Sequence, residues 1–207
     1  MSARPQPLDG PSEPFALAAR AAEQLAGRLG RNDHRLALWL GSGWQRALDE
    51  LNVTATTSTD ELAGFQPAGA MGHGSEAHSV RVDAPEGESL QALVFTGRTH
   101  LYEGHGPAAV AHGVRTAAAA GCTVAVLTNA AGCLRSGDAG ASDGGPDGAG
   151  AAWPIGSPVL ISDQLNLTGA SPLTGPLPPP PHAFRPGALT DAHHPRLRGL
   201  ARSGAPD

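Results

Sequence analysis

The sequence predicts an α/β fold, in which a β-sheet is flanked by helices. The main observation is the stretch Val94–Leu134, where a short apolar run, a polar turn, a helical pattern, a second apolar run and a second polar turn follow one another. An earlier apolar run, Arg35–Leu40, also ends in a glycine turn and leads into a helical pattern. Ligands of open α/β sheets collect outside the carboxyl ends of the strands, so these turns are the first candidates for a site.

The chain is expected to begin with a flexible arm, residues 1–13, and to continue as one α/β domain over residues 14–207. From Pro14 to Leu29, apolar residues recur at the spacing of an amphipathic helix, and Gly30 follows as a stop. We expect this helix to pack on the sheet.

The run Arg35–Leu40 is typical of a buried strand, and the turn Gly41-Ser42-Gly43 follows it. Helical spacing resumes at Trp44, so backbone N–H groups at a helix N-terminus could bind an anion here. A dinucleotide motif would need a third glycine at Arg46, and no P-loop lysine follows. Taken alone, Ser42 is either an anion ligand or merely the N-cap of the next helix.

Two further strands are predicted at His78–Val82 and Leu90–Phe95, with a hairpin turn over residues 84–88. His78 is expected to be a surface residue of its strand.

The stretch that follows Phe95 carries the densest group of polar side chains. They are Arg98, His100, Tyr102, Glu103 and His105. Tyr102 stands two residues after His100, so on an extended segment both would project to one side. Glu103 is expected to orient a nearby histidine and fix its tautomer.

A helix is predicted next, with Pro107 in its first turn and Gly121 as its stop. The strand Thr123–Leu127 then leads into Thr128-Asn129-Ala130-Ala131-Gly132.

Downstream, two segments are predicted to be flexible because they hold few residues to bury. They are the Gly/Asp-rich insert 135–152 and the Pro-rich segment 172–186. Between them, Ser157–Ser162 has the composition of another strand.

The sequence has 14 Lys+Arg against 19 Asp+Glu, which gives a net charge of −5. It contains no stripe of basic residues that could bind a nucleic-acid backbone, so nucleic acid is not expected as a partner. The N-terminus lacks the apolar core of a signal peptide, and no apolar run has the length of a membrane span. The two cysteines, Cys122 and Cys133, lack metal-ligand spacing. A cytoplasmic protein with reduced thiols is therefore expected.

The motifs GRTHLYEGH and VLTNAAG closely resemble the paired signature of the trimeric purine nucleoside phosphorylases. LWLGSGW and SPVLISDQLNLTGASPLTGP fall in the family's order, and Asp191–Arg198 resembles a segment that starts a helix in the family. The resemblance implies a phosphorylase-like twisted mixed β-sheet flanked by helices. It also implies a homotrimer, in which Phe184 matches an aromatic residue lent to a neighbouring subunit.

By the same resemblance, the phosphate ligands would be Ser42, His73, Arg98, His100 and the backbone N–H of Ala130. Arg98 and His100 would be catalytic, and Tyr102 and Asn129 would contact the nucleoside. His73 lies in a loop where Met71 replaces the family's usual proline, and Gln164 replaces a usual histidine. The alternative to a functional role is that Arg98, His100 and Tyr102 form an ordinary buried polar network.

The implied activity is phosphorolysis of purine (2′-deoxy)ribonucleosides such as inosine and guanosine, in purine salvage. Inorganic phosphate would be the co-substrate, without a metal or an organic cofactor. A guanidinium fork suits phosphate oxygens, and the held anion would stabilise the oxocarbenium-like transition state.

The family's chain extends beyond the equivalent of Asp207, so we expect the C-terminal portion of the fold, including the purine-binding residues, to be truncated. Two alternatives therefore stay open. One is a non-catalytic phosphate-binding or subunit-interaction module, and the other is a sister enzyme of the methylthioadenosine phosphorylase type.

Overall fold

The structure, a computed structural model, describes residues 13–66, 75–83, 87–132, 155–180, 189 and 191–204. They belong to two compact units: the described residues of the first lie within Met1–Ala130 and Thr168–Phe184, and those of the second within Ala131–Leu167 and Arg185–Asp207. The insert 135–152, His73, Cys133, Phe184 and all of the predicted arm except Glu13 lie outside the described residues. The domain boundaries proposed from the sequence stay a prediction.

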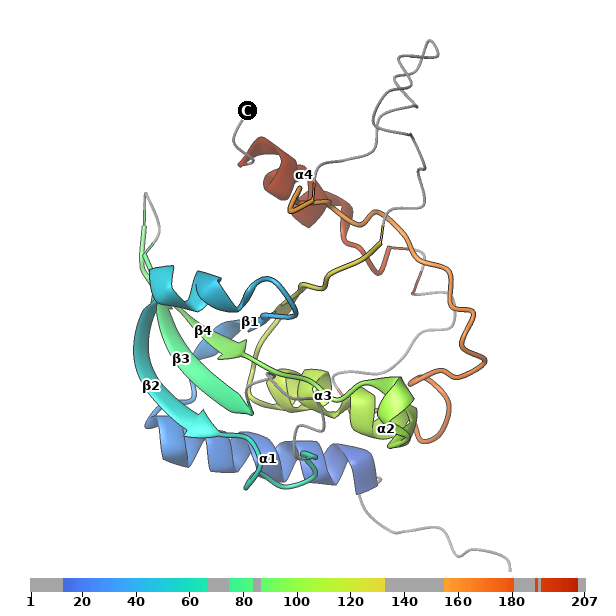
Figure 1. The fold of residues 1–207 in the computed structure, drawn as a ribbon. Helices are drawn as coiled ribbons and strands as arrows, with labels where there is room; N and C mark the ends of the chain where they lie inside the picture. The colour runs from blue at the N-terminus through green and yellow to red at the C-terminus, as the bar shows by residue number, and fades with distance from the viewer. Residues whose placement is uncertain are drawn as a thin grey trace, which may run out of the picture. The chain divides into compact units, whose positions relative to one another are not determined.

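The first unit is built on a mixed five-stranded sheet with the order β2-β3-β4-β1-β5. Its strands are β1 (His34–Trp39), β2 (Asn52–Ser58), β3 (Glu76–Val82), β4 (Leu90–Phe95) and β5 (Val124–Leu127). The pairs β2–β3 and β3–β4 are antiparallel, whereas β1 lies parallel to both β4 and β5. The predicted α/β class with a mixed sheet is confirmed, and Figure 1 shows the sheet with its helices.

Two α-helices and an apolar cluster cover one face of the sheet. The amphipathic helix α1 (Glu13–Leu29) and the helix α3 (His112–Ala119) pack together, and Leu25, Trp39 and Phe95 are central to this core. On the other face, Leu40, Val80 and Val94 are covered by residues of a 3₁₀ helix, η1 (Gln45–Glu50). Figure 1 shows η1 and α1 on opposite sides of the sheet.

The remaining helices of the described residues are short. They are the 3₁₀ turn η2 (Leu101–Glu103), α2 (Gly106–Val110) and, in the second unit, α4 (Pro195–Ser203). Because α4 begins within the segment Asp191–Arg198, the helix expected there is confirmed. The segment after Thr168 joins the first unit through Arg115, whose Nη2 donates to the carbonyl oxygen of Pro172 at 2.9 Å.

One strand was missed, and two expectations about strands were wrong. Strand β2 was not predicted, because its Thr-rich residues are mostly exposed and show no apolar alternation. His78 is buried, with 3% of its surface exposed, because β3 lies inside the sheet. Ser157–Ser162 forms no strand and is exposed. A strand needs a partner for its backbone groups, and among the described residues of the second unit there is none.

Two expectations about helices also need correction. The helix after the Gly41 turn is a 3₁₀ helix, and its N-cap is Trp44, so the interpretation of Ser42 as a helix cap was wrong. The helix expected between Pro107 and Gly121 is divided at Ala111 into α2 and α3. Gly113, a weak helix former, stands just after this break.

Candidate functional site

The ends of three parallel strands bring the predicted polar turns together at one edge of the sheet. Trp39 of β1 pairs in register with Phe95 of β4 on one side and with Leu127 of β5 on the other. The residues that follow these three positions therefore leave the sheet at the same edge. This is the place where an open α/β sheet binds its ligands.

At this edge, the half-buried Arg98 is held against the end of β5. Its Nη1 donates a hydrogen bond to the carbonyl oxygen of Thr128 at 2.6 Å. A guanidinium has five N–H donors in a rigid fork, so one bond to Thr128 fixes the group and leaves further donors for an anion.

The backbone of Gly41 passes directly beneath this contact. A Cβ atom at Gly41 would collide with the Thr128 carbonyl oxygen and would lie 2.7 Å from Nη1 of Arg98. The Gly41 N–H donates to Oγ1 of Thr128 at 2.9 Å, and this hydroxyl donates to the Trp39 carbonyl oxygen at 2.8 Å. Glycine is therefore required here because the backbone approaches closely, and Thr128 ties the ends of β1 and β5 together.

Ser42 is exposed in the turn that follows, which closes through a hydrogen bond from Trp44 N–H to the Gly41 carbonyl oxygen at 3.0 Å. Gly43 adopts φ +85°, a left-handed conformation that favours glycine. Asn129 and Ala130 are exposed after β5, and Nδ2 of Asn129 donates to the carbonyl oxygen of Ala130 at 3.1 Å.

His100 is bound by Glu103 on the η2 turn. One carboxylate oxygen accepts the backbone N–H of His100 at 3.0 Å, and the other lies 3.2 Å from Nδ1 of its ring. The bond from the His100 N–H is the main reason why the pKa of Glu103 lies below its ordinary value. Glu103 thus contacts both the backbone and the ring of His100.

The rings of His100 and Tyr102 stack, with centroids 4.9 Å apart and planes inclined by 17°. The segment is a 3₁₀ turn rather than the extended segment considered from the sequence, yet the two side chains still lie together. Tyr102 is 77% exposed, so its ring is available to a ligand.

A small cavity of about 70 Å³ lies beside these groups. Its lining includes Arg98 and Glu103 together with Trp39, Phe65 and His112. Sequence reasoning gave no role to Phe65, His112 or Thr128. The available signals were the position of Thr128 directly after a predicted strand and the placement of Phe65 directly after a glycine.

The lining of this cavity does not include Ser42, His100, Asn129 or Ala130. Among the described residues, no group of three or more His, Cys, Asp or Glu side chains could hold a metal ion. Within the same part of the chain, no helix has the length and apolar character needed to cross a membrane.

Curated relatives that are 42–44% identical to this chain are named purine nucleoside phosphorylase. The purine nucleoside phosphorylase of Cellulomonas sp is 44% identical over 197 residues, which cover 94% of this chain and 62% of that protein. The purine nucleoside phosphorylase of Mycobacterium tuberculosis is 43% identical over 198 residues, with the same two shares. The chain thus spans about three fifths of the length of these relatives.

Among solved structures, a purine nucleoside phosphorylase in complex with ribose-1-phosphate matches with a TM-score of 0.46 and 21% identity. The match covers 57% of this chain and 41% of that one, an overlap too slight to carry an argument. No protein-family model matches the chain. The identity of 42–44% to curated relatives, sustained over 94% of the sequence, shows that the chain belongs to the purine nucleoside phosphorylase family.

Proposed function

We propose that this chain takes part in the phosphorolysis of purine nucleosides, such as inosine or guanosine, to the free base and a pentose 1-phosphate. The single observation that carries this proposal is the fixed guanidinium of Arg98 at the carboxyl ends of β4, β1 and β5. The similarity to named purine nucleoside phosphorylases supports it.

In the proposed reaction, a phosphate oxygen attacks the anomeric carbon while the glycosidic C–N bond breaks. The electron pair of that bond leaves with the purine, which takes up a proton. Positive charge builds on the sugar during this step, and an anion held next to the anomeric carbon stabilises it electrostatically. Phosphate is a substrate here, and the proposal requires neither a metal nor an organic cofactor.

Each residue proposed from the sequence has one role in this scheme. Arg98, His100, Ser42 and the Ala130 N–H would bind phosphate, with Arg98 and His100 counted as catalytic. The exposed ring of Tyr102, stacked on His100, would face the sugar, and Asn129 would contact the nucleoside. His73, proposed as a further phosphate ligand, lies outside the described residues.

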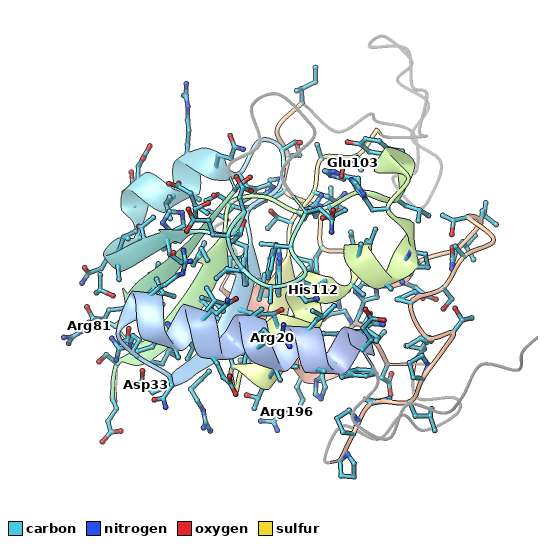
Figure 2. All side chains as sticks on the ribbon, turned by 90° about the horizontal axis from the view of Figure 1, so that it is seen from below. Arg20, Asp33, Arg81, Glu103, His112 and Arg196 are labelled. Carbon is cyan, nitrogen blue, oxygen red and sulfur yellow. The ribbon has the colours of Figure 1, made fainter. Side chains whose placement is uncertain are left out.

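The test is phosphate-dependent release of hypoxanthine from inosine by the 207-residue chain, with phosphate binding measured in parallel by calorimetry. Arg98→Ala should abolish both. The matched control is Arg81→Ala, which removes the same charge from β3. Arg81 is ion-paired with Asp83 and lies well away from Glu103 in Figure 2, so this variant should behave as the parent does.

Absence of phosphate binding by the parent, or unchanged binding by Arg98→Ala, would overturn the proposed site. Binding without hypoxanthine release would retain the phosphate site and show that these residues do not catalyse the reaction by themselves. Sedimentation of the same samples tests the homotrimer, and cell fractionation tests the cytoplasmic location, both of which stay predictions.

A further inference from the structure

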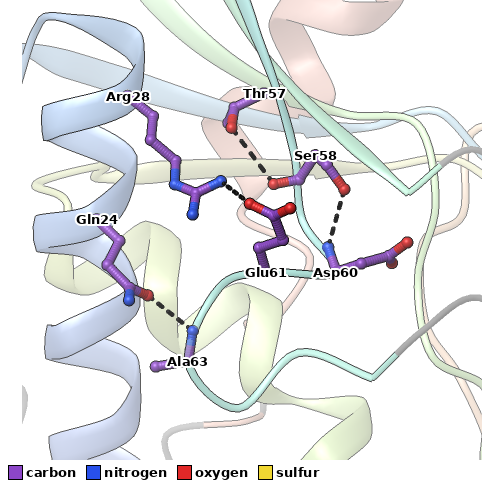
Figure 3. A network of polar contacts seen from close by, with 7 residues as sticks. All are labelled: Gln24, Arg28, Thr57, Ser58, Asp60, Glu61 and Ala63. Carbon is purple, nitrogen blue, oxygen red and sulfur yellow. Dashed lines mark hydrogen bonds and ion pairs between the residues drawn. The ribbon is translucent and has the colours of Figure 1, made fainter.

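Two helices hold the peptide groups of Ala63 from different sides. The Ala63 N–H donates a hydrogen bond to Oε1 of Gln24 on α1 at 2.8 Å (Figure 3). The carbonyl oxygen of Ala63 lies 2.8 Å from Nε2 of His112 on α3 and accepts a hydrogen bond from it. His112 is buried, with 4% of its surface exposed. The two hydrogen bonds therefore fix both the N–H and the carbonyl oxygen of Ala63, and so hold the loop more firmly than either bond would alone.

The next two residues, Gly64 and Phe65, pack closely against the ring of His112. Gly64 adopts φ +79°, and a Cβ atom there would lie 2.7 Å from Cε1 of His112. The ring of Phe65 then meets the His112 ring edge-on, with centroids 4.9 Å apart, and stacks on Phe95 at 6.1 Å. The chain from Ala63 to Phe65 is therefore fitted around one imidazole.

This fitted segment forms part of the wall of the cavity beside Arg98. Phe65, Gln66 and His112 all line the cavity that Arg98 and Glu103 also line. A shift of the Ala63 peptide would move Phe65 and Gln66, because they follow it directly along the chain. The position of Ala63 thus determines the shape of the space next to the Arg98 guanidinium.

We propose that Gln24 and His112 are positioning residues, which hold the Ala63 peptide so that the cavity beside Arg98 keeps the shape needed to bind an anion. The inference rests on the proposed function, since the anion is inorganic phosphate. Neither residue touches Arg98 in any contact described above. Gln24 does not line the cavity, so its effect on phosphate would pass through Ala63, Phe65 and Gln66.

The test compares two substitutions at one half-buried position of α1. Gln24→Leu keeps the approximate volume of the side chain and removes the acceptor of the Ala63 N–H. Gln24→Glu keeps an acceptor at the same reach. Calorimetric titration of the full chain with inorganic phosphate should show about tenfold weaker binding for Gln24→Leu and parental binding for Gln24→Glu.

The matched control is Arg28→Met, which breaks the 2.8 Å ion pair of Arg28 with Glu61 on the same loop (Figure 3). Both side chains of this pair are exposed, so its loss should leave phosphate binding unchanged. His112→Phe is a second test at the other end of the peptide, because it keeps an aromatic ring against Phe65 but removes the donor. Far-UV circular dichroism checks that each variant is folded at the titration temperature.

Weaker phosphate binding by Gln24→Leu and His112→Phe, with binding retained by Gln24→Glu and Arg28→Met, would support the inference. Parental affinity in folded Gln24→Leu and His112→Phe would overturn it and leave the proposed function intact. A parent chain that does not bind phosphate would overturn the proposed function, and this inference with it.

Discussion

Nη1 of Arg98 and the carbonyl oxygen of Thr128 lie 2.6 Å apart, although 30 residues separate them in the sequence. The contact joins the turn after β4 to the end of β5, across the end of β1 that lies between these strands. A backbone oxygen that accepts from an arginine holds the guanidinium without neutralising its charge. The positive group therefore remains able to attract an anion.

Gly41→Ala should disturb this contact, because the added Cβ would meet the Thr128 carbonyl oxygen and the Arg98 guanidinium. We expect the free energy of unfolding to fall by about 1–3 kcal/mol, as measured by urea denaturation. Gly27→Ala is the control, since a Cβ at Gly27 in α1 would meet nothing within 4 Å apart from the neighbouring backbone of its own helix. That variant should be neutral or up to about 1 kcal/mol more stable. Equal stability of Gly41→Ala and the parent would contradict the close approach.

Glu103→Gln should destabilise the η2 turn at neutral pH, because a charged group that accepts the His100 N–H and lies against Nδ1 is replaced by a neutral one. The expected loss is about 1–2 kcal/mol in the free energy of unfolding at pH 7. The folded-state pKa of Glu103 is lowered, so its stabilising contribution is present above the unfolded pKa of about 4.5 and is lost as the pH falls through the folded value.

The stability difference between Glu103→Gln and the parent should therefore shrink in urea titrations below about pH 4.5. Glu61→Gln supplies the comparison, since its carboxylate is 71% exposed in the pair with Arg28 and should contribute little at any pH. A difference that stays constant down to acid pH would show that the charge of Glu103 is not what stabilises the turn.

Three buried histidines should make the fold acid-sensitive. Burial lowers the pKa of His34, His78 and His112. Arg31 and Arg115 add to the shift at His34 and His112, while Asp33, Glu76 and the Ala63 carbonyl oppose it. The neutral ring is favoured in the folded state, so stability is greatest above the unfolded pKa of about 6.5 and falls as the pH drops below it.

Each buried histidine can contribute up to about 1.4 kcal/mol per pH unit to this loss of stability. Urea titrations between pH 8 and pH 5 would measure it. His34→Gln retains a polar partner for Ser79, which lies 2.9 Å from His34 in the core, and should flatten the dependence. His105→Gln, at an exposed position, should leave the dependence as it is in the parent.

The parts of the fold that sequence predicts are those in which a residue's environment is set by its near neighbours. Strands β1, β4 and β5 are apolar runs that end in glycine or polar turns, and α1 has a clear helical period. Strand β2 and the burial of His78 depend on which strands lie alongside, and hydrophobic patterning does not carry that information.

In the candidate site, too, local sequence predicts some residues, whereas others depend on tertiary contacts. Arg98, His100 and Glu103 were proposed because their side chains cluster within one short stretch, and Glu103 contacts His100 in the structure. The partners that fix the site come from elsewhere in the chain. Thr128 reaches Arg98, and the Ala63 peptide reaches His112, through tertiary contacts that no local pattern encodes.

Trp39 is an intrinsic fluorescent probe of the cavity beside Arg98. Its indole is 3% exposed, stacks on Phe95 with centroids 4.9 Å apart and lines the cavity beside Arg98. Trp44, 41% exposed in the Gly41 turn, experiences a wetter environment. Indole emission shifts with the polarity around the ring, so the two tryptophans would respond differently to quenchers in solution. The sequence holds a third tryptophan, Trp153, so a protein with both Trp44→Phe and Trp153→Phe would let the fluorescence of Trp39 follow, without any label, events at the inner wall of the cavity.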